Sequence, residues 1–304
     1  MGSPRFACEI LSALLRAQFP IIGVITQPDK PAGRGRHVTS CAAALLAQEK
    51  KLSLFQPDNL KDPIVQKQIA ALRPDFLVIA AYGQWIPSGI LQCAAIDSIN
   101  VHPSLLPKYR GAAPIQWALI HGDAETGVSL MRPVSKMDAG PFFAQTKVPI
   151  AQDDNEITLS DRLATIGGEL LVTSLPKIAS GKIKPVPQDE SLVTQAPLLK
   201  KEDGRIDWNL PAASLRNLVR GIVEWPKAYT SFDKKRVTLY DTAALPEKPN
   251  DTPGTVYLVS PQGIHVTSGD GSLCLKEVQL EGKKRMSGAD FARGVRVKTG
   301  DQFV

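Results

Sequence analysis

The sequence has few of the features that mark membrane or secreted proteins. No apolar run approaches the ~18–20 residues that a transmembrane helix needs. The first residues, MGSPRFACEILSALLR, lack the basic start and the long apolar stretch of a signal peptide. We therefore expect a cytoplasmic protein with no membrane partner.

Cysteine and histidine are scarce. The four cysteines, Cys8, Cys41, Cys93 and Cys274, lie far apart and form no C-x-x-C pair. Disulfide frameworks and zinc sites use closely spaced ligands. None of the four histidines has a second ligand at helical metal-binding spacing. The sequence therefore predicts free thiols and no metal.

Several catalytic signatures are missing too. There is no G-x-S-x-G, so a serine nucleophile at a strand-to-helix turn is not indicated. There is no G-x-x-x-x-G-K-[ST], so nucleotide hydrolysis is not supported. The G-x-G at residues 33–35 lacks the third glycine of a dinucleotide fingerprint and follows a later strand, so we expect no dinucleotide cofactor.

What remains is typical of a globular protein with more than one domain. The chain has 304 residues, of which 43% are hydrophobic and 22% charged. Domains of roughly 100–200 residues are usual, so this length suits two of them. The net charge of +6 is compatible with a nucleic-acid partner without requiring one.

Strand-like and helix-like segments alternate in the first part of the chain. Asp75–Ala81 and Ser98–His102 have the pattern of strands, whereas Cys41–Lys51 and Thr158–Ser180 have that of helices. The sequence leaves open whether the last helix continues through Gly167-Gly168. Alternation of this kind predicts an α/β domain with a doubly wound, mostly parallel sheet over residues 1–184.

The residue composition and pattern change further along the chain. Residues 185–202 are rich in Pro, Gln, Ser and Thr and are predicted to be a linker. Residues 203–304 contain one helix-like segment and several short β-like runs separated by Gly and Pro. We expect a smaller C-terminal β-barrel there, of the OB-like type.

The segment from residue 99 to residue 143 carries the strongest chemical signal. Asn100 and His102 alternate at the end of a predicted strand, so their side chains share a face at the edge where α/β sheets bind ligands. Asp138 follows in a loop. An amide can donate a hydrogen bond to an oxyanion, an imidazole can move a proton, and a carboxylate can orient the imidazole. The same residues also suit a purely structural interpretation, with two residues at a strand end and one in a turn.

The surrounding residues settle the choice by resemblance. The segment HPSLLPKYRGAAPIQ, preceded by Asn100 and followed by Asp138-Ala139-Gly140, resembles the signature of the folate-dependent formyltransferases. Further matching segments are GSPRFA, TQPDKPAGRGR, AYGQWIP, GDAETGVSLM, RIDWN and GKKRMSGADFARG. The resemblance covers nearly the whole chain.

The resemblance implies an activity and a set of site residues. The donor would be 10-formyltetrahydrofolate and the acceptor the amino group of methionyl-initiator-tRNA. Asn100 and His102 would stabilise the tetrahedral oxyanion, and Asp138 would hold His102. The residues implied in folate binding are Ser104, Leu105, Leu106 and Pro107, together with Tyr82 and Gly83.

The basic segment KPAGRGR has two interpretations. Composition alone is compatible with a solvated loop. The resemblance makes it the loop that meets the tRNA acceptor end, with Arg34 as the main contact and Lys30 and Arg36 beside it. The clusters at residues 234–236 and 283–285 are either solvated turns or part of an RNA-binding surface of the second domain. We expect the protein to act as a monomer.

The sequence leaves two alternative functions and one departure from the family pattern open. The chain could instead formylate a small amine, such as glycinamide ribonucleotide or an amino-sugar nucleotide. It could also be a non-enzymatic RNA-binding module, in which case Asn100, His102 and Asp138 would not converge. The family has a β-strand ahead of the segment that reads GSPRFA here, and Met1 stands where that strand would end. We expect this strand to be missing or trimmed: either the chain start was set late or the sheet lacks one strand, which would leave unpaired strand edges.

Overall fold

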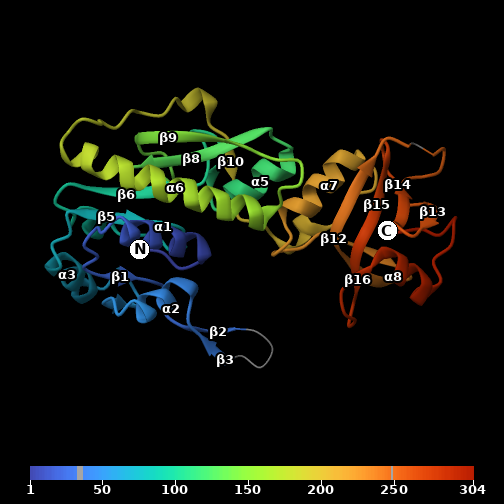
Figure 1. The fold of residues 1–304 in the computed structure, drawn as a ribbon, viewed down its shortest axis with the longest axis horizontal. Helices are drawn as coiled ribbons and strands as arrows, with labels where there is room; N and C mark the ends of the chain where they lie inside the picture. The colour runs from blue at the N-terminus through green and yellow to red at the C-terminus, as the bar shows by residue number, and fades with distance from the viewer. Residues whose placement is uncertain (33–36, 248) are drawn as a thin grey trace. The chain divides into compact units, whose positions relative to one another are not determined.

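The computed structural model describes residues 1–32, 37–247 and 249–304 and divides them into two compact units (Figure 1). The first unit comprises Met1–Pro114, Glu125–Pro149 and Ser160–Pro197. The second comprises Ile115–Ala124, Ile150–Leu159 and Leu198–Val304. The first unit thus includes most of the predicted linker, and the second takes two short segments from the middle of the chain.

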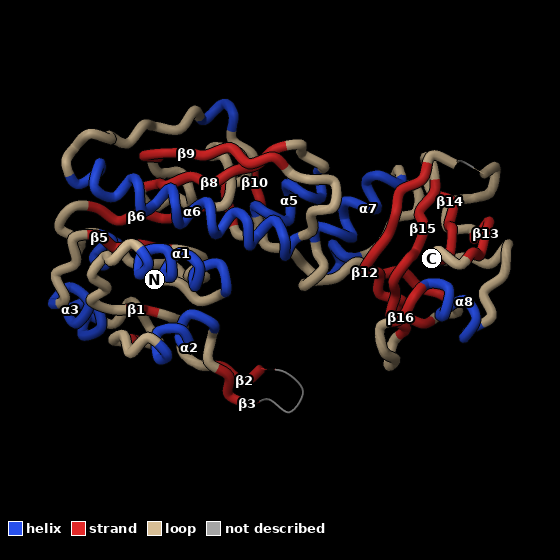
Figure 2. Tube along the Cα trace, viewed as in Figure 1, coloured by secondary structure: helices blue, strands red, loops and turns tan. Residues whose placement is uncertain are grey.

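The first unit is an α/β fold, as predicted (Figure 2). One sheet has the order β5-β6-β8-β9, and β1 pairs with β4 beside it. β5 and β6 are parallel, as are β1 and β4. β8 is antiparallel to both of its neighbours, β6 and β9. The strands are β1 (Val24–Ile25), β2 (Lys30–Ala32), β3 (His37–Thr39), β4 (Leu54–Phe55), β5 (Phe76–Ile79), β6 (Asp97–His102), β7 (Arg110–Gly111), β8 (Glu125–Met131), β9 (Phe142–Pro149) and β10 (Gln195–Ala196).

Helices surround these strands. They are α1 (Arg5–Arg16), α2 (Ala42–Glu49), α3 (Pro63–Ala71), α4 (Ser88–Leu91) and the part of α6 (Glu156–Ala179) that starts at Ser160. The helix α6 continues through its two central glycines. Both of them lie where a neighbouring element comes very close. A Cβ at Gly168 would lie 2.6 Å from the Ala13 Cβ of α1, and one at Gly167 would lie 3.0 Å from Val101 of β6. The glycines therefore let α6 approach α1 and the sheet.

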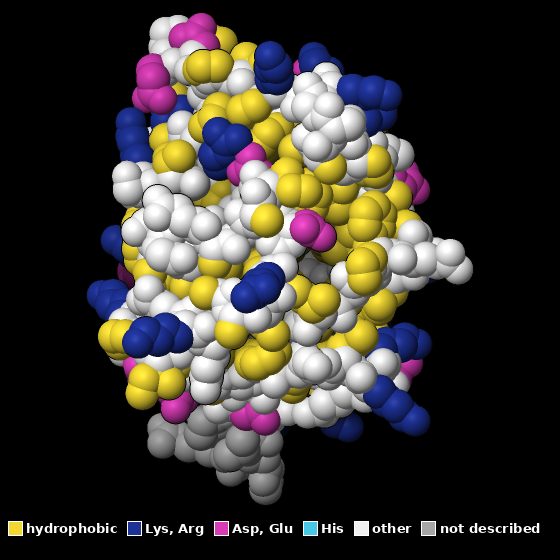
Figure 3. All heavy atoms as spheres, turned by 90° about the vertical axis from the view of Figure 1, so that its left-hand side faces the viewer, with side chains coloured by type: hydrophobic (Ala, Val, Ile, Leu, Met, Phe, Trp, Pro, Cys, Tyr) yellow, Lys and Arg dark blue, Asp and Glu magenta, His cyan; other side chains and the backbone are white. Residues whose placement is uncertain are grey.

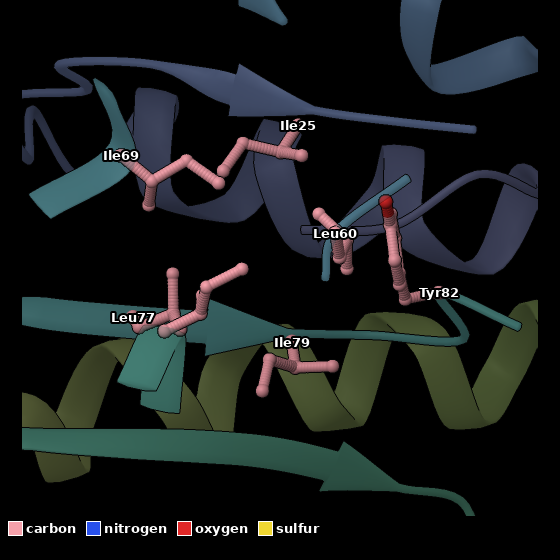
Figure 4. Close-up of a cluster of buried hydrophobic side chains, with 7 residues drawn as sticks. Ile25, Leu60, Ile69, Leu77, Ile79 and Tyr82 are labelled. Atoms are coloured by element: carbon pink, nitrogen blue, oxygen red, sulfur yellow. The ribbon is translucent and has the colours of Figure 1, made fainter. Parts of the chain in front are cut away.

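The chain start lies between β1 and β5. The Met1 carbonyl accepts a hydrogen bond from Ala80 N at 2.9 Å, and Gly2 N donates to Ile25 O at 3.0 Å. Beyond this short link, an apolar cavity of about 140 Å³ separates the two strands. That a strand is missing at this place stays a prediction. A cluster of buried hydrophobic side chains joins β1 to β5 (Figure 4), and its members Ile25, Ile69 and Leu77 also line this cavity.

The segment predicted as a linker is hydrogen-bonded into the first unit as far as residue 196. Val186 pairs with Phe142 through two main-chain hydrogen bonds of 2.8 and 3.0 Å. Further on, β10 runs parallel to β7. Its low periodicity reflects short, irregular pairings with segments distant in the sequence. The domain boundaries at residues 184 and 203 themselves stay a prediction.

The second unit contains an antiparallel sheet with the order β11-β12-β15-β14-β13, with β16 added on β15. Its strands are β11 (Tyr229–Phe232), β12 (Lys235–Leu245), β13 (Val256–Ser260), β14 (Gly263–Thr267), β15 (Ser272–Leu280) and β16 (Met286–Ser287); its helices are α5 (Pro114–His121), of which all but Pro114 belongs to this unit, α7 (Ala212–Gly221) and α8 (Gly288–Val295).

The last residues of the chain join the two ends of this sheet. Ser231 of β11 and Val304 exchange two main-chain hydrogen bonds of 2.8 and 2.9 Å. Val256 of β13 donates to Asp301 O at 2.8 Å, and Phe303 packs against Phe232 with ring centroids 5.0 Å apart. The tail therefore closes the sheet, in agreement with the barrel that was predicted.

The cysteines, the helix lengths and one face of the first unit complete the description. The four cysteines are free. Within the described residues, no helix has the length and apolarity to cross a membrane. On the face of the first unit seen in Figure 3, hydrophobic side chains gather, and Lys and Arg are scattered among Asp and Glu. The coloured part of that face offers apolar contact more than a basic patch.

Candidate active site

A cavity of about 480 Å³ opens in the first unit beside the ends of β5, β6 and β8. Its lining includes Asn100, His102 and Asp138, the three residues proposed for catalysis from the sequence. The exposed side chains of Trp85 and Met137 also border it. A flat, largely apolar ligand with a few polar groups suits such a lining.

Strand β6 aims Asn100 and His102 at this cavity. Asn100 lies between Ile79 of β5 and Met131 of β8 in the sheet register. Residues two apart on a strand share a face, so His102 points the same way as Asn100. Val101 points to the other face, toward Gly167 of α6. Among the described residues, none hydrogen-bonds the Asn100 amide, so the amide is available to a ligand.

His102 is held in one tautomer. Its side chain is 5% exposed, and Nε2 lies 2.9 Å from the carbonyl oxygen of Tyr109. A carbonyl only accepts, so Nε2 carries a hydrogen and donates it. The proton that His102 can gain or lose is therefore on Nδ1. That atom lies 3.8 Å from Oδ2 of Asp138, a separation too long for a direct hydrogen bond but close enough for charge stabilisation.

Asp138 comes from the loop between β8 and β9. Its Oδ2 accepts a hydrogen bond of 3.0 Å from Gly111 N, and its side chain is 16% exposed. The backbone of Asp138 is left-handed, with φ of +49°. This conformation is uncommon for residues other than glycine and persists only where neighbouring contacts impose it. The carboxylate thus has a defined place at the cavity beside the imidazole.

The segment Ser104–Pro107 is not part of the cavity lining. The Ser104 hydroxyl is buried and donates to Lys108 O at 2.7 Å. Leu106 N donates to the Ser129 hydroxyl at 3.0 Å, and Leu106 O accepts from Gln145 at 2.7 Å. These contacts fold the segment against β8 and β9, next to Pro103, which does line the cavity. A direct role for Ser104, Leu105, Leu106 and Pro107 in folate binding stays a prediction.

Tyr82 and Gly83 border the cavity. The Tyr82 ring packs beside Leu60 in the buried cluster of Figure 4, and its hydroxyl has no hydrogen-bond partner within the described part of the chain. Burial raises the pKa of this hydroxyl. The Tyr82 carbonyl accepts a hydrogen bond of 2.8 Å from Gln27 Nε2. Since the ring is committed to the core, the main chain of residues 82–83 is the part best suited to meet a ligand.

Only the start of the basic segment, Lys30–Ala32, lies within the described residues. Strands β2 and β3 are antiparallel. Lys30 is exposed and donates to Gln27 Oε1 at 3.0 Å. Asp29 next to it accepts from Gln56 and Ser40 at 2.8 Å each, and these bonds lower its pKa. Arg34 and Arg36 lie outside the described residues, so their role stays a prediction.

The described residues contain no group of three His, Cys, Asp or Glu side chains that could hold a metal ion. The amide, imidazole and carboxylate can instead stabilise an oxyanion and move a proton, which are the needs of acyl transfer.

Sequence reasoning missed the groups that hold His102 and Asp138 in place. These are the main-chain groups of Tyr109 and Gly111 and the side chain of Gln188, which donates to Asp138 O at 2.7 Å. Tyr109 and Gly111 lie within the matching motif, so a signal existed, although not for main-chain roles. Gln188 lies in the predicted linker, where nothing local marks it.

Two sequence profiles match the chain. The profile described as formyl transferase covers residues 1–175, and the one described as formyl transferase, C-terminal domain, covers residues 198–296. The chain therefore belongs to the formyl transferase family, and it is an enzyme.

Curated relatives narrow the class. A methionyl-tRNA formyltransferase of Geobacter metallireducens is 40% identical over 300 residues, 99% of this chain and 96% of that protein. One of a Synechococcus strain is 41% identical over 312 residues, 99% of this chain and 96% of that protein. Within the formyl transferase family, the chain belongs to the group of methionyl-tRNA formyltransferases.

A solved structure shares the fold at lower identity. It is the N-formyltransferase of Helicobacter canadensis in complex with folinic acid and dTDP-3-aminofucose, with a TM-score of 0.67 and 15% identity over 90% of this chain and 96% of that chain. Together with the family assignment, the convergence of Asn100, His102 and Asp138 removes the reason for a non-enzymatic interpretation.

Proposed function

We propose that this enzyme transfers the formyl group of 10-formyltetrahydrofolate to the amino group of methionyl-initiator-tRNA, a step of translation initiation. The observation that carries the proposal is that Asn100, His102 and Asp138 line one cavity of about 480 Å³. The acceptor is supported by relatives that carry this name at 40% and 41% identity. The folate donor is supported by the similar fold of an N-formyltransferase solved with folinic acid.

The reaction balances without a covalent enzyme intermediate. The neutral methionyl amine attacks the formyl carbon, and the carbonyl oxygen takes the displaced electron pair as a tetrahedral oxyanion. Collapse of this species restores the carbonyl and breaks the bond between the formyl carbon and N10 of the folate. One proton leaves the amine and one reaches N10, so no net proton is released. The enzyme must stabilise the oxyanion and carry the proton.

The three side chains divide these tasks. The Asn100 amide donates a hydrogen bond to the oxyanion. His102 takes the amine proton on Nδ1, because Nε2 is committed to the Tyr109 carbonyl at 2.9 Å. The resulting imidazolium lies 3.8 Å from Asp138, whose negative charge stabilises it. The protonated ring then assists Asn100 at the oxyanion and returns the proton toward N10.

The donor site draws on the rest of the lining. The Tyr82–Gly83 main chain and the 135–140 loop frame the pteridine, and Pro103 supplies a rigid wall. The segment Ser104–Pro107 holds that wall through its bonds to β8 and β9. Trp85 and Met137 offer apolar contact to the parts of the ligands nearer solvent.

The tRNA contacts come from two basic regions, described separately. In the first unit these are Lys30, Arg34 and Arg36, which suit the splayed single-stranded acceptor end. In the second unit, the Arg236 guanidinium lies 3.7 Å from the centre of the Tyr229 ring, and that of Arg285 lies 4.2 Å from the centre of the Tyr240 ring. The Arg285 guanidinium is also paired with the Glu277 carboxylate, so Arg236 is the better placed of the two for phosphate contact.

The acceptor is tested by comparing separate reactions, each with a different acceptor. Wild-type protein is given labelled 10-formyltetrahydrofolate with methionyl-initiator-tRNA, uncharged initiator tRNA, glycinamide ribonucleotide or an amino-sugar nucleotide. We expect label only in the methionyl-tRNA reaction, as N-formylmethionine after deacylation. Faster transfer to a small amine than to methionyl-tRNA would replace this acceptor with that amine. Transfer from another formyl donor but none from the folate would overturn the donor assignment.

A further inference from the structure

The Gln188 carboxamide joins the loop that carries Asp138 to Arg110. Its Nε2 donates to Asp138 O at 2.7 Å and to Gly140 O at 2.6 Å. Its Oε1 accepts from Arg110 Nε at 3.0 Å. An amide side chain has two N–H donors, and both are used on this loop. The contacts therefore define where the loop lies on each side of Ala139.

Arg110 anchors the glutamine. Its side chain is 2% exposed, and its guanidinium also makes a forked pair with Glu190, at 2.6 and 3.3 Å. Glu190 accepts from Lys136 as well, at 3.2 Å, so the network returns to the same loop. The bonds from Arg110 and then Lys136 lower the pKa of Glu190 to about 2. The Glu190–Lys136 pair is exposed and contributes little, so Arg110 is the main anchor.

The Asp138 loop needs such external support. Asp138 has a left-handed backbone, with φ of +49°. Where the loop returns to the sheet, a Cβ at Gly140 would lie 1.8 Å from Arg132 O, so the chain passes very close to its neighbour. Strained conformations of this kind persist when surrounding groups over-determine them. Gln188 binds the carbonyls of both Asp138 and Gly140.

The network and the reacting groups also share a segment. Arg110 is followed by Gly111, whose N–H donates to Asp138 Oδ2 at 3.0 Å. Gly111 is paired in turn with Ala196 across the β7–β10 ladder. Asp138 is therefore held through its main chain by Gln188 and through its carboxylate by Gly111, and both supports depend on the chain that follows α6.

We propose that Gln188, anchored by Arg110, is a positioning residue that holds the Asp138 carboxylate at His102. The proposal rests on the proposed function, in which Asp138 stabilises the protonated His102. Within the described residues, the Gln188 side chain bonds two main-chain carbonyls of the loop and Arg110, and it bonds neither Asn100, nor His102, nor the Asp138 carboxylate. The segment after α6 thus completes the active site without adding a side chain to its lining.

The test compares Gln188→Ala with Gln188→Glu and with a matched control, Gln195→Ala. Gln195 is exposed on the same segment, and none of the described hydrogen bonds involves its side chain. Small misplacements of catalytic groups cost up to ~10²-fold in rate. We expect kcat to fall ~10–100-fold for Gln188→Ala, and at least as far for Gln188→Glu, which places a carboxylate oxygen against two carbonyls. Both KM values should stay within ~3-fold of wild type, and Gln195→Ala should keep the wild-type kcat.

A double-mutant cycle separates positioning from a general structural role. If Gln188 acts through Asp138, then kcat of the Gln188→Ala, Asp138→Asn protein equals that of Asp138→Asn within ~3-fold. The proposal would be overturned if the kcat loss of the double variant equalled the product of the two single losses. A fall in the unfolding midpoint that accounts for the lost activity would overturn it as well. Should Asp138→Asn alone retain full activity, the proposed role of Asp138 fails. Should it abolish activity while Gln188→Ala leaves kcat unchanged, only the positioning role fails.

Discussion

Replacing Asn100 by alanine removes an oxyanion donor with little disturbance to the fold. Asn100 lies in the middle of the sheet, but its amide has no hydrogen-bond partner in the described part of the chain and faces the cavity. The main-chain pairing with Ile79 and Met131 does not need the side chain. Loss of one preorganised donor typically lowers kcat by ~10²–10³, or about 2.7–4 kcal/mol of transition-state stabilisation. The expected change in unfolding free energy is below ~1 kcal/mol.

The assay is single-turnover formyl transfer with saturating donor and methionyl-tRNA, together with urea unfolding of each variant. Asn59→Ala is the matched control, because Asn59 is an exposed amide of the same unit, and its side chain makes one hydrogen bond within the described residues, accepted from Lys61 N. It should keep the wild-type rate. Asn100→Asp should lose more than Asn100→Ala, since a carboxylate cannot donate and repels the oxyanion. A rate for Asn100→Ala within ~3-fold of wild type would refute the reasoning.

The remaining predictions concern stability and tRNA binding. Burial raises the pKa of Glu156, so its stabilising contribution is complete below the usual value of 4.5 and is lost as pH rises through the raised value. Unfolding free energies measured from pH 4.5 upward should therefore decline less steeply for Glu156→Gln, and equal slopes would contradict this. Gly168→Ala should destabilise by ~1–3 kcal/mol, because its Cβ would lie 2.6 Å from Ala13. Gly294→Ala, with open space around it in α8, should instead stabilise by up to ~1 kcal/mol in thermal unfolding, and the same sign for both would be evidence against the packing argument. Lys30→Ala should reduce the salt dependence of tRNA affinity by ~0.7–0.9 in the log–log slope, and an unchanged slope would remove Lys30 from the interface.

The sequence predicts the parts of this protein whose information is local. The apolar run Asp75–Ala81 contains β5, and Cys41–Lys51 contains α2. The alternation of Asn100 and His102 also sufficed to place both on one face of β6, because a strand has a period of two. Their role in catalysis stays a prediction that the geometry supports.

Groups that depend on distant partners escaped this reasoning. Gln188 meets residues about 50 positions away in sequence, so its segment has no periodicity and resembled a linker. The closure of the C-terminal barrel by residues 301–304 is likewise a pairing with strands far back in the chain. The helix α1 is different: Phe6, Ile10 and Leu14 recur every four residues and are buried, a local signal that the sequence analysis did not use.

The central claim is that His102 carries the proton in a folate-dependent formyl transfer to methionyl-tRNA. The most direct measurement is the single-turnover rate of His102→Ala beside that of His121→Ala, an exposed histidine of the second unit. The account predicts a loss of ~10²–10⁴-fold for His102→Ala, at unchanged folding, and the wild-type rate for His121→Ala. A folded His102→Ala protein that formylates methionyl-tRNA at the wild-type rate would contradict it.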